Sequence, residues 1–406
     1  MAGTRSHAGP AAPAGPPIAP PAPRGFAVRF LSPEPPPLAE VAPYYRLSEQ
    51  AGFYANDGPC ARMLATRLAA FVGDGAGCVP VASCTAGLLL AIRAVFGPPD
   101  GRRTLVATPS YTFTATACVI RWCGFEPLFV DVDADGWQMD PIDLERALAA
   151  HDGEIAGVLG CSTFGTAAPS DVLTSWKAAC ERRRVPLVID SAAGFGSEDD
   201  LGRRLGSRGL VEVFSFHATK PFAVGEGGAV LTPDPDTADT IQRLANFGLE
   251  PGTRVTQTAG INGKMSELAA ATGCAMADRY ERVLVDRRAT AEACRARLAG
   301  LPVRFQAGSE RSTMQIHQVT LPDRRSRDAA LGIARDLRVE ARSYFDPPLH
   351  RHPAFSTCPR TGDLPVTEHL AARSLSLPMA NRMEEWQMDR VAEVVSRATR
   401  RRVRAA

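Results

Sequence analysis

The sequence predicts an α/β fold in which helices cover both faces of a mainly parallel β-sheet, with a smaller α+β domain at the C-terminal end. The first observation behind this prediction is that short apolar runs alternate with helical patterns from about residue 58 to residue 233. Parallel neighbouring strands need crossover connections, and helices usually provide them, which gives three αβα layers. The second observation is a change of pattern beyond about residue 285, where an arginine-rich helix precedes less regular strands and a final helix.

The expected elements follow one another regularly along the chain. Residues 58–72 have the apolar spacing of a helix, and residues 170–184 form another such pattern, with Ser170 as its N-cap. The expected strands are the apolar runs at 104–109, 127–133, 154–161, 185–190, 211–216 and 227–233. Because the chain is long enough for a large core and a smaller one, we expect a large domain over residues 25–285 and a small domain over residues 286–406.

The composition is ordinary for a soluble globular protein. Hydrophobic residues make up 45% and charged residues 22% of the 406 positions, and the formal net charge is +2. This near-neutral balance gives no reason to expect a nucleic-acid or membrane partner, and no apolar run reaches the length of a transmembrane span. Residues 1–24 are rich in proline and alanine, which predicts a disordered tail. The same prolines interrupt any apolar core of a secretory signal.

Cysteines and acidic residues give no sign of a metal. The 10 cysteines contain no CxxC pair and no zinc-site spacing. Several lie in apolar runs, which favours reduced, buried thiols in a cytoplasmic protein. The segment 133–140 has some of the acidic residues of a calcium loop but lacks the full ligand series and the closing glutamate. We therefore expect no metal site.

Polar residues gather where the expected strands end, which is where ligands bind to parallel sheets. Lys220 follows the strand at 211–216 and precedes Pro221 and a glycine-rich stretch, so it is not a lysine of a solvated helix face. In a partly dry pocket the pKa of such a lysine falls, and the neutral amine can condense with an aldehyde. The alternative is a lysine at a loop end that pairs with a carboxylate. Lysine is rare in this chain, because only Lys177, Lys220 and Lys264 occur.

Three further features lie at these strand ends. Asp190 ends an apolar strand, where a carboxylate needs a partner such as a protonated pyridine nitrogen; the alternative is a helix N-cap. The turn at 83–87 leads into an apolar helix, so its first N–H groups and Thr85 can hold a phosphate. Ser215 can add a hydroxyl, although the turn by itself is also an ordinary N-cap. Phe113 either stacks on a flat ring or belongs to the core.

In their order along the chain, which is the turn at 83–87, Phe113, Asp190, Ser215 and Lys220, these features resemble the DegT/StrS family of sugar aminotransferases. This family depends on pyridoxal 5′-phosphate (PLP) and has an aspartate-aminotransferase-like fold of type I. The resemblance runs from about residue 45 to the end of the chain. The matching segments are FYANDGP (53–59), SCTAGLLLAI (83–92), TPSYTFTATA (108–117), SFHATKPFAVGEGGAVLT (215–232), LANFG (244–248), GINGKMSELAAA (260–271), YFDPPLHRHPAF (344–355) and LSLPM (375–379). The segment at 215–232 is the most specific, because a lysine followed by GEGG marks the Schiff-base lysine of the family.

The resemblance implies a role for each candidate residue. Lys220 would carry PLP as a Schiff base and move the proton in transamination, Asp190 would pair with the pyridine nitrogen, and Phe113 would stack on the ring. The phosphate would be bound by Thr85, the backbone of Cys84 and Ser215. Asn262 would reach the phosphate of a neighbouring subunit, which implies a homodimer with shared active sites. Further substrate contacts are expected from His217, Lys264, Tyr344 and His350.

The resemblance also implies a reaction. An amino group would move from glutamate or glutamine to a keto sugar, expected to be nucleotide-linked, or to a keto cyclitol, in antibiotic or surface-sugar biosynthesis. Three positions depart from the family, because Cys84 stands where glycine is common, and Ala193 and Phe195 stand where glutamine and histidine are usual. The usual glutamine hydrogen-bonds the ring oxygen of the cofactor.

Two alternatives therefore stay open. One is a diverged PLP reaction, such as a dehydratase, an oxidase-like activity or an amino-acid transformation. Some dehydratases of the family have histidine in place of the lysine, and Lys220 counts against that form. The other alternative is a non-catalytic regulatory protein on the same fold. Both Lys220 and Asp190 are intact, which counts against a regulatory protein.

Overall fold

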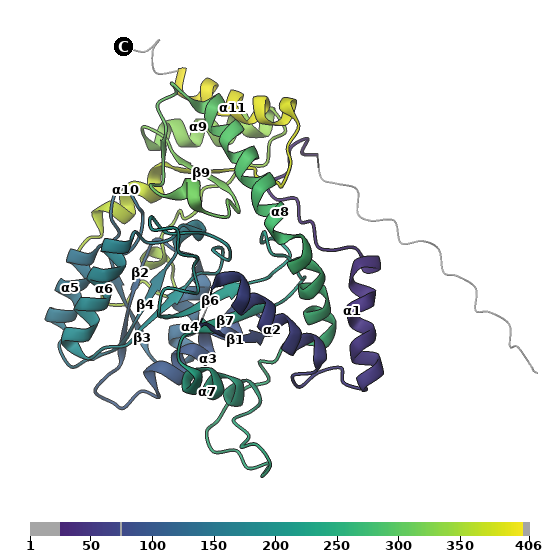
Figure 1. Ribbon diagram of the computed structural model, residues 1–406. Coiled ribbons are helices and arrows are strands. Elements are labelled where there is room, and N and C mark those ends of the chain that lie inside the picture. Colours follow the sequence, from purple (N-terminus) through teal and green to yellow (C-terminus); the bar gives the residue numbers. More distant parts are fainter. Residues whose placement is uncertain (1–24, 74, 401–406) are drawn as a thin grey trace, which may run out of the picture.

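The computed structural model describes residues 25–73 and 75–400, and the tail expected over residues 1–24 lies outside this part of the chain. A large αβα unit occupies the lower part of Figure 1, and a smaller α+β unit lies above it. Helix α8 (Glu267–Leu298) runs along one side from the large unit to the small one. The fold class predicted from the sequence is confirmed.

The large sheet contains seven strands within the described residues, in the order β1-β7-β6-β5-β4-β2-β3. They are β1 (Gly77–Val81), β2 (Leu105–Pro109), β3 (Glu126–Val130), β4 (Ile155–Cys161), β5 (Leu187–Asp190), β6 (Val211–Ser215) and β7 (Gly228–Thr232). Neighbours are parallel from β6 to β3, whereas β7 runs antiparallel to both β1 and β6. The sequence pattern predicts every strand except β1. This strand contains Pro80, and an edge strand tolerates a proline because one side of its ladder is unpaired.

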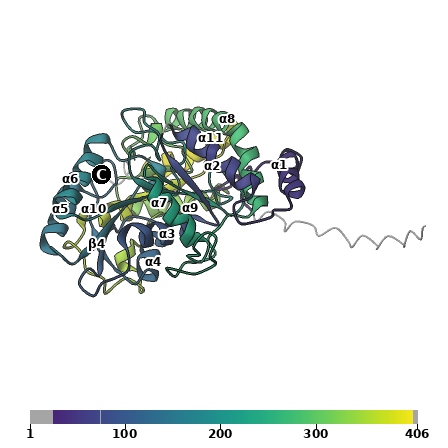
Figure 2. The same ribbon diagram turned by 60° about the horizontal axis from the view of Figure 1, so that its bottom comes forward.

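Alternation along the strands gives each face of the sheet its own helix layer. In β5, Val188 packs with one layer and Ile189 with the other. The layer on the Val188 side consists of α3 (Cys84–Phe96), α4 (Thr114–Trp122) and α7 (Pro235–Ala245). The opposite layer consists of α2 (Pro59–Val72), α5 (Pro141–Ala150), α6 (Ser170–Arg183) and α8. Helix α1 (Leu38–Ala51) lies outside the layers beside α8, as Figure 2 also shows.

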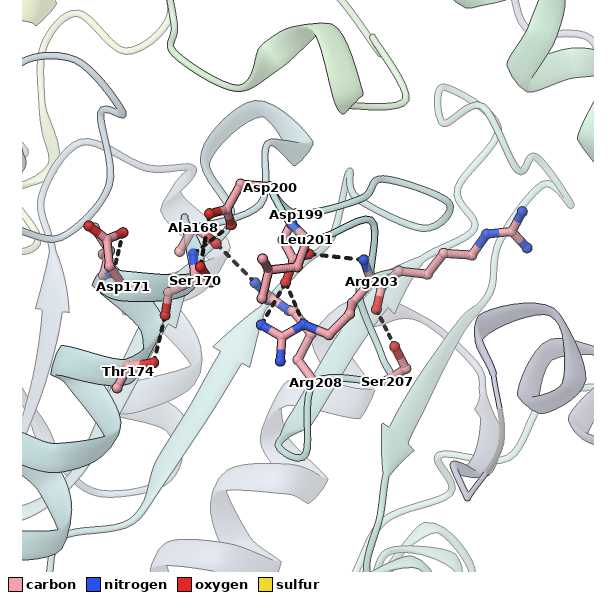
Figure 3. A network of polar contacts seen from close by, with 12 residues as sticks. Ala168, Ser170, Asp171, Thr174, Asp199, Asp200, Leu201, Arg203, Ser207 and Arg208 are labelled. Atoms are coloured by element: carbon pink, nitrogen blue, oxygen red, sulfur yellow. Dashed lines mark hydrogen bonds and ion pairs between the residues drawn. The ribbon is translucent and has the colours of Figure 1, made fainter.

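Helix α6 begins differently from the sequence-based expectation. Pro169, not Ser170, is the N-cap residue, and Ser170 is the first helical residue. The N–H and the hydroxyl of Ser170 both donate to the carboxylate of Asp200, at 2.7 and 2.8 Å (Figure 3). The carboxylate of Asp200, in a distant loop, therefore caps the N-terminus of α6, a role that was expected of the Ser170 side chain. The local sequence pattern cannot indicate such a contact, because its two residues are 30 positions apart.

The loop after β5 is held by its own polar contacts and by a buried ion pair. Asp199 accepts hydrogen bonds from the backbone and side chain of Arg203 (Figure 3). Further along, the guanidinium of Arg208 binds both carboxylate oxygens of Glu212 at 3.0 and 2.9 Å, and both side chains are buried. Ser191 donates to the same carboxylate at 2.9 Å. This network therefore fixes the backbone immediately after Asp190.

The small unit has an antiparallel sheet, with β9 (His317–Thr320) between β10 (Ser374–Leu377) and β8 (Arg304–Phe305). Its helices are α9 (Arg324–Asp336), α10 (Pro365–Arg373) and α11 (Glu385–Arg400). In the part of the chain that the structure describes, the 3-10 helices are Thr163–Gly165, Ser309–Arg311 and Leu349–Arg351.

The two units share parts of the chain. The expected boundary at residue 285 falls inside the continuous helix α8. In addition, Val28 belongs to the apolar core of the small unit, together with residues of β9 and α11. The division into 25–285 and 286–406 therefore stays a prediction. None of the helices in the described ranges is long and apolar enough to cross a membrane.

Candidate active site

A cavity of about 490 Å³ opens at the carboxyl ends of β4, β5 and β6. Cys161, Asp190 and Ser215 are the last residues of these strands, and the pairing register places them on the face that α3 and α4 cover. Many residues proposed from the sequence line this cavity, namely Cys84, Thr85, Phe113, Asp190, Ser215, His217, Lys220 and Tyr344.

Lys220 lies in a turn, where its backbone N–H donates to the carbonyl of His217 at 2.8 Å. Its amine donates to Oε1 of Gln315 at 3.0 Å. Removal of the amine from water lowers the pKa of Lys220, and the nearby thiol of Cys84 and carboxylate of Asp190 oppose this effect without reversing it. The environment therefore favours the neutral amine, which is the nucleophilic form.

The glycines after Lys220 allow β7 to approach the beginning of α3. A Cβ atom on Gly228 would lie 2.6 Å from the carbonyl oxygen of Phe214 and 2.8 Å from the backbone nitrogen of Cys84. Real Cβ atoms do not come so close, so a side chain at this position would push the helix away. The second glycine of the GEGG motif, Gly227, is also crowded, by Val224 and Met265. The motif is thus required by the packing of the strand against the cavity wall.

Asp190 is a buried carboxylate with two hydrogen bonds. Thr116 donates to its Oδ2 at 2.8 Å, and the N–H of Ala192 donates to its Oδ1 at 3.1 Å. Burial raises the pKa of Asp190, although both hydrogen bonds and Lys220 favour the charged form. A cationic partner in the cavity would recover the free energy lost by this burial.

The N-terminus of α3 forms one wall of the cavity. Ser83 caps the helix by accepting a hydrogen bond from the N–H of Ala86 at 3.1 Å. The N–H groups of Cys84 and Thr85 belong to the first turn, which has no intrahelical acceptors, so they are suited to an anion. The hydroxyl oxygen of Ser215 accepts from the N–H of His217 at 3.3 Å, which leaves its own hydrogen to donate.

Phe113 stands at the N-cap of α4 and is 60% exposed, so the alternative of a core residue is wrong. It is among the residues that line the cavity. Together these groups fit PLP: an amine for its aldehyde, a buried carboxylate for its ring nitrogen, a helix N-terminus for its phosphate and an aromatic face for its ring.

Two of the expected substrate residues lie at the cavity and are held by neighbours. Nδ1 of His217 accepts from the N–H of Thr219 at 3.2 Å, and its Nε2 lies 3.5 Å from the carboxylate of Glu226. The hydroxyl of Tyr344 accepts from the guanidinium of Arg342 at 2.7 Å.

Three other expected residues are not brought to this cavity. His350 is buried elsewhere, with Nδ1 2.8 Å from the hydroxyl of Ser110 and Nε2 2.8 Å from Glu368. Both ring nitrogens are therefore engaged in tying the small unit to the large one. Lys264 donates to Asn246 at 2.7 Å and lines a separate hollow of about 870 Å³. Asn262, which was expected at the phosphate of a neighbouring subunit, is exposed and lies outside the lining of the cavity in its own chain, so its role stays a prediction.

The two unusual positions after Asp190 have different surroundings. Ala193 lines the cavity and presents only a methyl group there. Phe195 is buried away from the cavity, in an aromatic cluster with Phe71, Phe222 and Tyr280. The aromatic side chain at this position therefore serves packing.

Sequence reasoning missed several residues of the site, which are Thr116, Cys161, Arg342 and Gln315. Thr116 lies three positions after Phe113 at the start of α4, and this spacing is a signal that the sequence contains. Burial raises the pKa of Cys161 to about 12, so its thiol stays neutral. Gln315 and Arg342 come from the C-terminal part of the chain, and nothing in the local pattern marks them.

Comparisons with known proteins agree with this geometry. The model of the DegT/DnrJ/EryC1/StrS aminotransferase family matches residues 39–396. Protein Rv3402c of Mycobacterium tuberculosis is 37% identical over 374 residues, which is 91% of this chain and 90% of that protein. The dTDP-4-amino-4,6-dideoxy-D-glucose transaminase of Shigella dysenteriae is 29% identical, over 85% of this chain and 91% of the relative.

A solved structure is similar over nearly the same range. The crystal structure of DesI in the presence of its TDP-sugar product superposes with a TM-score of 0.82 at 32% identity, covering 94% of this chain and 95% of DesI. The family model spans most of the chain, and the cavity has the groups that PLP requires. The chain therefore belongs to the DegT/DnrJ/EryC1/StrS aminotransferase family and is a PLP-dependent aminotransferase.

Proposed function

We propose that this aminotransferase moves an amino group from glutamate or glutamine to a nucleotide-linked keto sugar, or else to a keto cyclitol, in the cytoplasm and in antibiotic or surface-sugar biosynthesis. The observation that carries the proposal is that the amine of Lys220 shares one cavity with the buried carboxylate of Asp190 and the N-terminus of α3. The names of the Shigella relative and of DesI with its TDP-sugar product support a sugar as acceptor.

PLP, when bound, supplies an electron sink for the charge that is left when a proton leaves the substrate carbon. The residues of the chain supply the rest of the chemistry. The amine of Lys220 would hold the cofactor, and its Nζ would take that proton and return it. Asp190 would pair with the protonated ring nitrogen, and the hydrogen bond from Thr116 favours the charged form of Asp190 against the effect of burial. Phe113 orients the ring, and the first N–H groups of α3 bind the phosphate.

The outer part of the cavity supports an acceptor with a negative charge. Arg342 lines the cavity, and its guanidinium is held by Glu340 at 2.9 Å and by the hydroxyl of Tyr344 at 2.7 Å. It also lies over the ring of Phe30, 4.6 Å from the centroid. An arginine has five N–H donors, so these contacts leave donors for a diphosphate or a carboxylate.

A homodimer with shared active sites is part of the proposal. The segment after α7 extends away from the sheet in Figure 1. Phe247 and Ile261 follow α7 in the sequence, lie side by side and are 49% and 39% exposed. Phe53 and Tyr54 are also more than half exposed. Exposed apolar side chains of this size support a contact with a second copy of the chain, to which Asn262 would contribute.

The test is the visible absorption spectrum of the purified full-length protein with PLP, before and after addition of glutamate or glutamine, with Lys220→Ala as control. The expected result is a cofactor band that the donor bleaches and that is absent from the Lys220→Ala protein. Isotope-labelled donor and a panel of nucleotide-linked keto sugars then identify the acceptor by mass spectrometry. No cofactor band with excess PLP would refute the proposal and favour a regulatory protein.

One observation favours a second candidate, which is a diverged PLP reaction on the same cofactor. Ala193 presents a methyl group to the cavity at the position where the family usually has a glutamine. A cofactor band that none of glutamate, glutamine, aspartate and alanine bleaches would favour this candidate over amino transfer.

A further inference from the structure

We propose that Gln315 positions the side chain of Lys220. The carboxamide oxygen of Gln315 is an uncharged acceptor for the hydrogen bond from the amine, and Arg287 fixes the backbone of Gln315. The inference rests on the proposed role of Lys220 as the amine that bears the cofactor. It adds a residue from the C-terminal part of the chain to the catalytic machinery of the large unit.

The two ends of the Gln315 carboxamide have different partners. Oε1 accepts from the amine of Lys220 at 3.0 Å, and Nε2 donates to the carbonyl of Thr219 at 3.3 Å. The carbonyl can only accept, so the orientation of the amide group is determined by its contacts. Gln315 therefore binds both the amine of Lys220 and the backbone of the preceding residue, which fixes the direction of the lysine side chain.

Arg287 of α8 holds the segment that carries Gln315. This buried guanidinium donates to the carbonyl oxygens of Thr313 at 3.0 Å and Gln315 at 3.1 Å, and also to that of Met314. Met314 has a φ of 50°, in the left-handed region that a side chain seldom adopts. Three consecutive carbonyls turned toward one cation explain how this conformation is maintained.

The same segment is docked onto the loop that follows Asp190. The hydroxyl of Thr313 donates to the carbonyl of Ala193 at 2.7 Å, and the N–H of Thr313 donates to the hydroxyl of Ser197 at 3.0 Å. The position of Gln315 is thus set relative to both sides of the cavity, by Arg287 from α8 and by the loop after β5.

The group that accepts the hydrogen bond from Lys220 is the uncharged carboxamide of Gln315. The charged or titratable groups around the amine come from every wall of the cavity and are Cys84, Cys161, Asp190, His217, Glu226, Arg342 and Tyr344. Among the described residues that line the cavity, Gln315 carries the only carboxamide. An amide accepts a hydrogen bond without adding negative charge, so it does not oppose the lowering of the Lys220 pKa by desolvation. A carboxylate in the same place would stabilise the ammonium form instead.

The rarity of lysine makes this inference directly testable, because the chain has Lys177 and Lys264 as internal references. The full-length protein, stripped of cofactor, is treated with acetic anhydride over a series of pH values, and acylation of each lysine is followed by peptide mass spectrometry. The variants are Gln315→Glu, which adds charge, and Gln315→Met, which has similar length and no acceptor. Gln315 is partly exposed, so both variants are expected to fold, and thermal unfolding checks this.

We expect the apparent pKa of Lys220 to rise by about 1–3 pH units in Gln315→Glu, the range for an opposite charge at this distance. In Gln315→Met it should not rise, and the profiles of Lys177 and Lys264 should be unchanged in both variants. An unchanged Lys220 profile in Gln315→Glu would overturn the inference, as would a change shared by all three lysines. Whether added PLP protects Lys220 of the wild-type protein from acylation is measured separately. Its failure would count against the proposed function alone.

Discussion

Thr116 donates a hydrogen bond of 2.8 Å to Asp190, so a hydroxyl from the start of α4 supports the carboxylate that ends β5. The bond favours the charged form of Asp190 against the effect of burial. It therefore connects the helix that presents Phe113 with the electrostatics of the cavity floor.

Replacement of Thr116 by valine should weaken PLP binding. A hydrogen bond to a charged group is worth about 1.5–3 kcal/mol, so the dissociation constant should rise at least about tenfold. Thr114→Val is the matched control, because Thr114 lies on the same helix and its hydroxyl is 3.6 Å from the thiol of Cys118, not at Asp190. Fluorescence titration with PLP measures both variants, and an equal loss in both would contradict the role of Thr116.

Asp190→Asn should lower the affinity for PLP but raise the stability of the cofactor-free protein at high pH. Burial raises the pKa of Asp190 in the folded protein, so the folded state binds more protons than the unfolded state between the two pKa values. This group therefore contributes stability at low pH that is lost as the pH rises through that window. We expect the cofactor-free Asn variant to be more stable than the wild type at pH above this window, while its affinity for PLP falls. Thermal unfolding at several pH values would show a curve parallel to the wild type if the idea is wrong.

The ion pair between Arg208 and Glu212 should be essential for stability. Both side chains are buried, and removal of one partner leaves an uncompensated charge. Arg208→Met should therefore lower the free energy of unfolding by about 3–5 kcal/mol. Arg397→Met, which removes an exposed pair with Glu393, should change it by less than about 1 kcal/mol. Denaturant unfolding measures both, and similar losses would contradict the distinction.

Gly228→Ala should damage the phosphate end of the cavity. The added Cβ would meet the carbonyl of Phe214 and the backbone nitrogen of Cys84, so the start of α3 must move. We expect a large loss of PLP affinity, measured by titration. Gly332→Ala in α9 is the control, because its Cβ would enter open space within a helix. That variant should bind PLP normally and gain about 0.5–1 kcal/mol of stability.

The sequence predicted those features that depend on local order. Lys220, Asp190 and the turn at 83–87 each follow an apolar run, and parallel strands bring such positions to one edge. The direction of β7 was not predicted, because its apolar run reads the same in a parallel or an antiparallel strand.

The remaining differences arise from contacts between distant parts of the chain. Gln315 lies 95 positions from Lys220, and its importance depends on how the small unit docks. His350 was expected at the substrate, but Ser110 and Glu368 engage both of its ring nitrogens. A histidine that joins two units and a histidine that faces a substrate have the same local sequence pattern.

Helix α8 has a consequence for the design of chimeric enzymes. Its first half packs in the core of the large unit, and its last residue, Leu298, packs in the core of the small unit. A crossover at residue 285 would place the two halves of α8 in different parent sequences, although they form one continuous helix. A junction at residue 299 keeps α8 in one piece, because the helix has ended there, but Leu298 must then match the small core of the other parent. Since Val28 packs with the same small core, a faithful exchange of that unit must also carry the strand-like stretch at 26–31 from the same parent.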